Sequence, residues 1–103
     1  MPHDEHYSCS ADVQIKEHSG KCGTLSGGDK QCDIEGTVEN KGSGTAYNVQ
    51  VRVEWSAEYD FVYWTPDPIA VLGPGETAEF EARFNGYEIP SRYDIYVECG
   101  SYQ

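Results

Sequence analysis

The chain has 103 residues, enough for one domain with a modest hydrophobic core. Its 18 acidic and 7 basic residues give a net charge of −11, which argues against nucleic acid and anionic membranes as partners, because both attract clustered Lys and Arg. No apolar run approaches the length of a membrane span, so we expect no membrane insertion by this segment. The aromatic and β-branched residues, with 11 Gly and 5 Pro, favour strands joined by turns.

The N-terminal third predicts one strand between two irregular segments. Residues 1–8 have no hydrophobic periodicity, and we expect a flexible lead-in there, followed by a single domain over residues 9–103. Apolar and polar side chains alternate in residues 11–18, which predicts a half-buried first strand. Residues 19–31 are rich in Gly and Ser and are predicted to form a loop.

Two further strands are predicted on either side of a glycine-rich break. Alternation resumes at Cys32 and continues to Glu39. Residues 40–44, with the sequence NKGSG, are typical of a tight turn and predict a hairpin. The next strand has a large apolar residue at every second position from Tyr47 to Trp55, a period that excludes a helix. We expect both strands to turn their apolar faces into one core.

The C-terminal half is also predicted to consist of short strands joined by turns. Residues 59–64 predict a short strand, and the prolines that follow them predict a crossing segment or an edge strand up to Leu72. A turn at residues 73–76 precedes an alternating strand over 78–84, and a last strand is predicted over 93–99. Short strands at near-regular spacing predict an all-β, two-sheet β-sandwich of six or seven strands.

A family resemblance adds to this interpretation. The stretches IEGTVENKGSGTAYNVQVRVEW, LGPGETAEFEARF and YDIYVE resemble the immunoglobulin-like sandwiches of microbial cell-surface proteins, in particular the CARDB adhesion-related family and the FxLYD family. The resemblance covers roughly residues 32–98 and depends on core and turn positions. It implies an immunoglobulin-like antiparallel sandwich that acts as a non-catalytic spacer, adhesion or accessory module. The implied partner is an unknown protein or glycan, and we expect a monomer.

The four cysteines favour disulfides, because the Cys-x-x-Cys spacing of zinc and thioredoxin sites is missing. Disulfides would place the protein in an extracellular or cell-surface compartment. On the strand order that the resemblance implies, the last strand runs parallel to the strand that begins at Cys32. Cys32 and Cys99 would then lie at opposite ends of the sandwich. Cys9 would open the first strand at the end where Cys99 closes the last, and Cys22 and Cys32 would bracket the first loop at the other end, so the resemblance implies the pairs Cys9–Cys99 and Cys22–Cys32.

The sequence contains no catalytic motif that we can assign. The GSG and SGG stretches have the composition of turns and precede no predicted helix, so no nucleophile elbow or phosphate loop is expected. We expect no enzyme activity and no cofactor. His3, His6 and Cys9 recur at a spacing of three, but we expect no metal site, because imidazole ligands need orienting partners. His18, at a predicted strand end, is expected to be solvated.

An aromatic cluster offers an alternative function. Tyr59, Tyr63 and Trp64 lie close together on a predicted edge, where a carbohydrate or small ligand could stack on them. The acidity has three explanations that stay open. It could keep the chain soluble, adapt it to high salt as in a halophile, or form a cation site.

Overall fold

The computed structural model describes residues 2–56, 61–64 and 68–103, and for 61–64 it describes the strand without its side chains. None of these residues lies in a helix, so none belongs to a helix able to cross a membrane. In chain order the strands are β1 (His3–Tyr7), β2 (Val13–Thr24), β3 (Lys30–Asn40), β4 (Ala46–Ser56), β5 (Phe61–Trp64), β6 (Ile69–Leu72), β7 (Thr77–Gly86), β8 (Arg92–Glu98) and β9 (Ser101–Tyr102).

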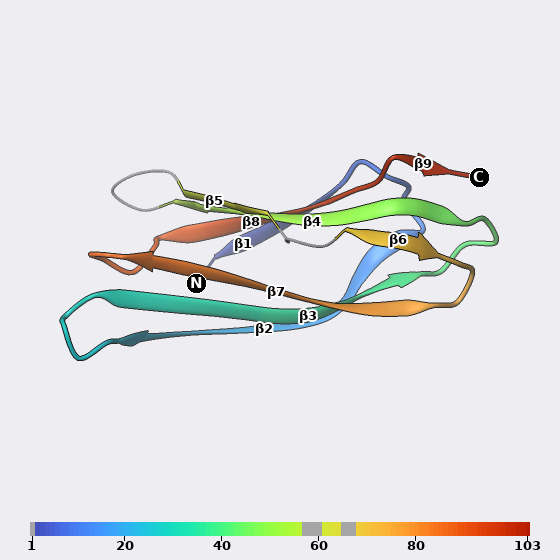
Figure 1. The fold of residues 1–103 in the computed structure, drawn as a ribbon. Helices are drawn as coiled ribbons and strands as arrows, with labels where there is room; N and C mark the ends of the chain where they lie inside the picture. Colours follow the sequence, from blue (N-terminus) through green and yellow to red (C-terminus); the bar gives the residue numbers. More distant parts are fainter. Residues whose placement is uncertain (1, 57–60, 65–67) are drawn as a thin grey trace.

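The strands form two sheets that pack face to face (Figure 1). The large sheet has the order β1-β8-β4-β5, and β6 and β9 also pair with β4. The small sheet has the order β2-β3-β7 and is antiparallel throughout. The prediction of an all-β, two-sheet sandwich is therefore confirmed. The molecule is elongated, with principal extents of 47 × 20 × 20 Å.

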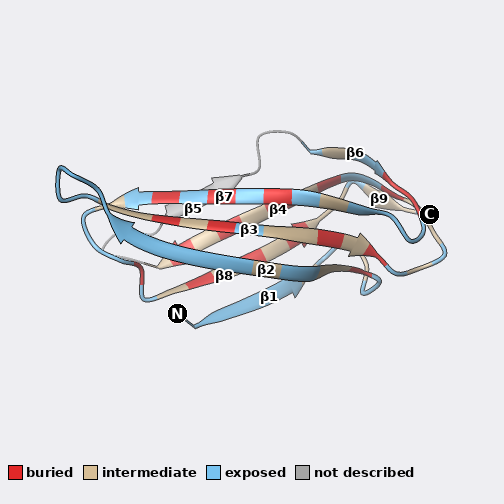
Figure 2. Ribbon diagram, turned by 90° about the horizontal axis from the view of Figure 1, so that it is seen from below, coloured by how far each residue is buried: buried red, intermediate tan, exposed pale blue. Residues whose placement is uncertain are grey.

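The N-terminal residues form a strand where a lead-in was expected. β1 pairs with β8 in parallel, from His3 opposite Tyr93 to Tyr7 opposite Val97, so the large sheet is mixed and not wholly antiparallel. Most of β1 is exposed, as its pale blue ribbon shows (Figure 2). Alternation did not reveal it because its four leading residues are polar on both faces. Backbone pairing at the sheet edge needs no apolar side chains.

Residues 19–31 also differ from the prediction, because much of the expected loop is strand. β2 continues to Thr24 and β3 begins at Lys30, so the turn is confined to the residues between them. The turn is closed by the Leu25 amide, which donates to the Asp29 carbonyl at 2.7 Å. The second half of β2, from Ser19 to Thr24, is exposed. Like β1, it lacks an apolar face, so no hydrophobic alternation marks it as a strand.

Residues 40–44 do not close a hairpin, because β3 and β4 belong to different sheets. The buried Asn40 side chain organises this crossing. Its amide nitrogen donates to the carbonyls of Gly44 at 2.8 Å and Leu72 at 2.9 Å, and its oxygen accepts from the Gly42 amide at 3.0 Å. The composition of residues 40–44 indicates a reversal of the chain, which fits a crossing between sheets as well as a hairpin.

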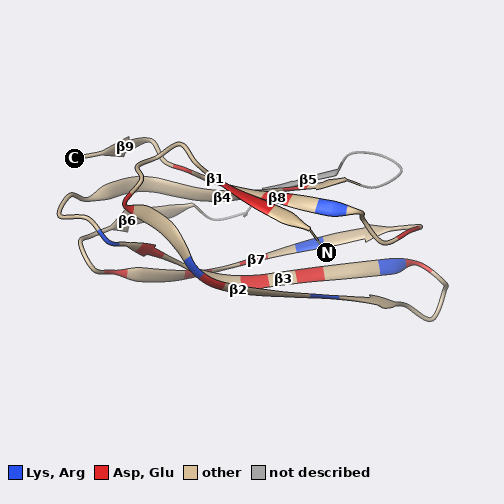
Figure 3. Ribbon diagram, turned by 180° about the vertical axis from the view of Figure 1, so that it is seen from behind, with Lys and Arg blue, Asp and Glu red and all other residues tan. Residues whose placement is uncertain are grey.

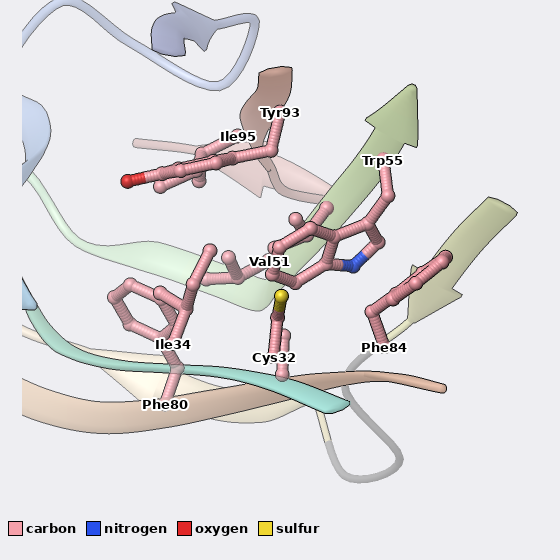
Figure 4. Close-up of a cluster of buried hydrophobic side chains, with 10 residues drawn as sticks. Cys32, Ile34, Val51, Trp55, Phe80, Phe84, Tyr93 and Ile95 are labelled. Atoms are coloured by element: carbon pink, nitrogen blue, oxygen red, sulfur yellow. The ribbon is translucent and has the colours of Figure 1, made fainter. Parts of the chain in front are cut away.

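The core lies between the two sheets and consists of two clusters. One cluster surrounds Trp55, whose ring centroid lies 5.7 Å from that of Phe84 and 5.4 Å from that of Tyr93 (Figure 4). Its buried members are Cys32, Ile34, Val51, Val53, Trp55, Phe80, Ala82, Phe84, Tyr93 and Ile95. A second cluster contains Val13, Val38, Ala46, Val49, Leu72 and Val97. The predicted common core of the strands at Cys32 and Trp55 is confirmed.

Tyr47 is an exception to the predicted core face of β4. It is 36% exposed, whereas Ala46 beside it and Val49 are fully buried. The cause is Asn48, whose φ of 55° lies in the left-handed region and shifts the phase of the alternation. Asn tolerates this conformation better than other residues with a side chain, but its presence in the sequence did not predict the shift.

Both predicted disulfides are present, and no cysteine is free. Cys22 and Cys32 face each other in the β2–β3 pair, with their Cα atoms 4.1 Å apart. Cys9 follows β1 and Cys99 follows β8, and their Cα atoms are 4.9 Å apart. Because β1 and β8 run in parallel, the two cysteines arrive at the same end of the sandwich. Two disulfides are typical of a protein from an oxidising compartment.

Candidate functional site

A group of polar side chains lies where β1 of the large sheet faces β2 of the small sheet. On β2, the pairing register with β3 shifts between Ile15 and Glu17, which marks a β-bulge. The bulge changes which residues face inward, so His18 follows Val13 and Ile15 on the inner face. His18 pairs with Gly36, and the Phe80 ring packs closely over this glycine.

The inner face of β1 completes the group. His3, Glu5 and Tyr7 pair with residues of β8 that point into the core, so their side chains share that side of the sheet. One donor atom from each of His3, Glu5 and His18 lies within 4.8 Å of the other two. His18 Nδ1 and Glu5 Oε1 are 3.5 Å apart. We call these three residues the His–Glu–His cluster.

Neighbouring tyrosines hold the cluster in place. The Tyr93 hydroxyl lies 3.2 Å from His18 Nε2, and the His3 ring stacks on the Tyr93 ring at 5.1 Å between centroids. The Tyr7 hydroxyl donates to Glu5 Oε2 at 3.2 Å and accepts the Ile15 amide at 3.3 Å. Each member of the cluster therefore contacts an aromatic side chain that limits its motion.

The electrostatics favour neutral imidazole at His18. Burial lowers the pKa of His18, the positive potential of His3 lowers it further, and Glu5 opposes both effects. Because the ordinary value is near 6.5, His18 is uncharged at pH 7 and one of its ring nitrogens has a free lone pair. Burial also raises the pKa of Tyr93, so its hydroxyl stays protonated. His18 is thus a half-buried member of a cluster, not the solvated side chain that was expected.

His3, His6 and Cys9, the triad discounted above, do not come together. Cys9 is bonded to Cys99. His6 lies on the outer face of β1, where its ring stacks on Tyr96 at 4.5 Å. On the same face, Arg92 of β8 forms an ion pair with Asp4 of β1. Figure 3 shows these two strands, with acidic residues in red and basic residues in blue.

A groove of about 460 Å³ opens near one end of the sandwich. Its lining residues come from β2, β3, β4, β8 and the segment before β8, and include the Cys22–Cys32 disulfide, Trp55, Ile89 and Tyr93. Ile89 is 50% exposed although it is apolar. The buried Trp55 indole N–H has no hydrogen-bond acceptor among the described residues. The apolar walls of the groove suit a small, largely apolar ligand.

The predicted ligand-binding residues are not part of this groove. Tyr59 lies outside the described residues. Tyr63 and Trp64 belong to β5, which pairs with β4 at the sheet edge, and their side chains are likewise outside the description. The prediction of an aromatic ligand site at these three residues therefore stays a prediction.

Comparison of the chain with protein-family models, with curated proteins and with solved structures finds no match. The resemblance to the CARDB and FxLYD families therefore stays a hypothesis, and the functional argument depends on the chain's own geometry.

Proposed function

We propose that this chain is a non-catalytic, immunoglobulin-like module of a secreted or cell-surface protein, where it acts as a spacer, adhesion or accessory domain. The observation that carries the proposal is an elongated sandwich with a disulfide at each end. The connectivity supports the immunoglobulin-like assignment, because β3 pairs with β7 in one sheet and β4 pairs with β8 in the other.

The charge distribution agrees with an exposed module. Glu35, Glu79 and Glu81 lie on the outer, solvated face of the small sheet, opposite the core. A net charge of −11 favours solubility and disfavours self-association. If the acidity is instead an adaptation to high salt, the unfolding temperature should rise strongly between about 0.1 M and molar salt, where the Debye length falls to about 3 Å.

Two measurements test this proposal. The oxidised chain should resist protease for much longer than the chain reduced with dithiothreitol, because an extracellular module depends on its disulfides. Equal resistance would remove the support for an oxidising compartment. The oxidised chain should also hydrolyse nitrophenyl esters and glycosides no faster than buffer. Turnover that co-purifies with the folded chain would contradict a non-catalytic role.

The second candidate function is binding of a carbohydrate or other small ligand. The groove with its half-exposed Ile89 favours it, since apolar walls bind small, largely apolar ligands. Titrating glycans while recording amide chemical shifts separates the two functions. Localised shifts at Ile89 or near Tyr63 and Trp64 would favour ligand binding, and an unchanged spectrum would favour the spacer.

A further inference from the structure

We propose that His3, Glu5 and His18 form a binding site for a divalent transition-metal ion of the zinc class, joining β1 of the large sheet to β2 of the small sheet. This inference is independent of the spacer function. A module could bind the ion and still lack catalytic activity.

The donor atoms have the required type and spacing. Zinc binds imidazole nitrogen at about 2.0–2.1 Å and carboxylate oxygen at about 2.0–2.2 Å, so tetrahedral ligand atoms lie roughly 3.3 Å apart. His18 Nδ1 and Glu5 Oε1 are 3.5 Å apart, and all three donor atoms lie within 4.8 Å of one another. His3 is exposed, so its side chain has room to adjust toward the other two donors.

Outer contacts orient these donors as a metal site requires. Ligating histidines typically donate their second ring N–H to an oxygen, which fixes the tautomer. The Tyr93 hydroxyl lies 3.2 Å from His18 Nε2 and can accept that proton, leaving the Nδ1 lone pair directed toward Glu5. A lone pair facing a carboxylate is repulsive unless a cation lies between them. The second oxygen of Glu5 accepts a hydrogen bond from Tyr7, so the first oxygen remains available.

A simpler arrangement without metal is possible, and the distances weigh against it. In the other tautomer, His18 Nδ1–H would donate to Glu5. The 3.5 Å separation is longer than the 2.7–3.2 Å of normal N–H···O hydrogen bonds. That tautomer also assigns no role to His3, whose ring lies 4.7 Å from that of His18. Two imidazoles beside one carboxylate are explained more fully by a shared ion.

The ligand set selects the class of ion. Two nitrogen donors and one oxygen suit zinc, copper or nickel, whereas calcium and magnesium prefer oxygen ligands alone. Three protein ligands leave a fourth position for water. The negative charge of the chain raises the local cation concentration.

Isothermal titration with Zn²⁺ tests the proposal on the full, oxidised chain in a background of millimolar Mg²⁺. We expect one Zn²⁺ per chain. The variants His3→Gln and Glu5→Gln should each weaken Zn²⁺ binding by more than tenfold, since loss of even an outer-shell partner costs about 10–100-fold. The matched control is His6→Gln, which alters an imidazole on the opposite face of β1 and should change the affinity less than threefold.

Tyr93→Phe tests the orienting contact separately. It should weaken Zn²⁺ binding about tenfold while circular dichroism and both disulfides remain unchanged, because only the hydroxyl is removed. Imidazole resonances in a ¹H–¹⁵N spectrum should show Zn²⁺ binding at His3 and His18 and no change at His6. Absence of binding, or equal weakening by His6→Gln and His3→Gln, would overturn the proposal. Equal weakening would indicate general attraction of cations to an acidic surface.

Discussion

Removing the Cys9–Cys99 disulfide should destabilise the chain more than any other single covalent change. The two cysteines are 90 positions apart, so the bridge closes almost the whole chain. On the chain-entropy model, a loop of this size contributes about 4–5 kcal/mol to the free energy of unfolding. Domains of this size have about 5–15 kcal/mol in total. The variant Cys9→Ala/Cys99→Ala should therefore unfold roughly 20–30 °C below the parent chain.

The Cys22–Cys32 bridge provides a matched comparison. Its cysteines are only 10 positions apart, so the same model gives about 3 kcal/mol. Urea denaturation at equal protein concentration, with the remaining bridge verified by mass spectrometry, measures both losses. The Cys9–Cys99 variant should also show a larger m-value, because its unfolded chain is more expanded. A loss below about 1 kcal/mol, or an unchanged m-value, would refute the entropic reasoning.

Three further substitutions probe other parts of the fold by the same urea denaturation. Asn40→Ala should cost about 2–4 kcal/mol, because it leaves buried backbone groups at the sheet crossing without partners; a cost below 0.5 kcal/mol would contradict that role. Gly36→Ala should cost about 1–3 kcal/mol, because the new Cβ would lie 2.6 Å from the Phe80 ring; unchanged stability would mean that the ring shifts freely. At Asp33, a hydrogen bond from Arg83 holds the pKa of the carboxyl below its usual value. The stabilisation that the Asp33–Arg83 pair provides is therefore present above about pH 4 and is lost as the pH falls through the lowered pKa of Asp33. Asp33→Asn should cost up to about 1 kcal/mol at pH 7, because the pair is exposed, and nothing at pH 2. A cost that is equal at both values would be inconsistent with this ion pair.

The candidate site was largely hidden from sequence reasoning. His3 and Glu5 alternate correctly for one face of a strand, but nothing in residues 1–8 indicated that they pair with β8, 90 positions away. His18 lay at the end of a predicted strand in a phase that pointed outward. Only the bulge after Ile15 turns it inward, and a bulge leaves no reliable mark in the residue pattern. The sequence contains the two histidines and the glutamate, but it does not show that they lie close together in the fold.

The amino-acid order determined which side chains are buried along the central strands, because a strand exposes alternate faces and the apolar residues from Cys32 to Val38 and from Val49 to Trp55 keep that period. The strand order implied by the family resemblance also led to both disulfides. Tertiary packing decided which strands are neighbours, that β3 and β4 lie in different sheets, and where Asn48 and the bulge in β2 change the phase. The reason is physical. Burial of one face is a local property of a strand, whereas pairing partners and bulges depend on the fit between segments that are distant in the chain.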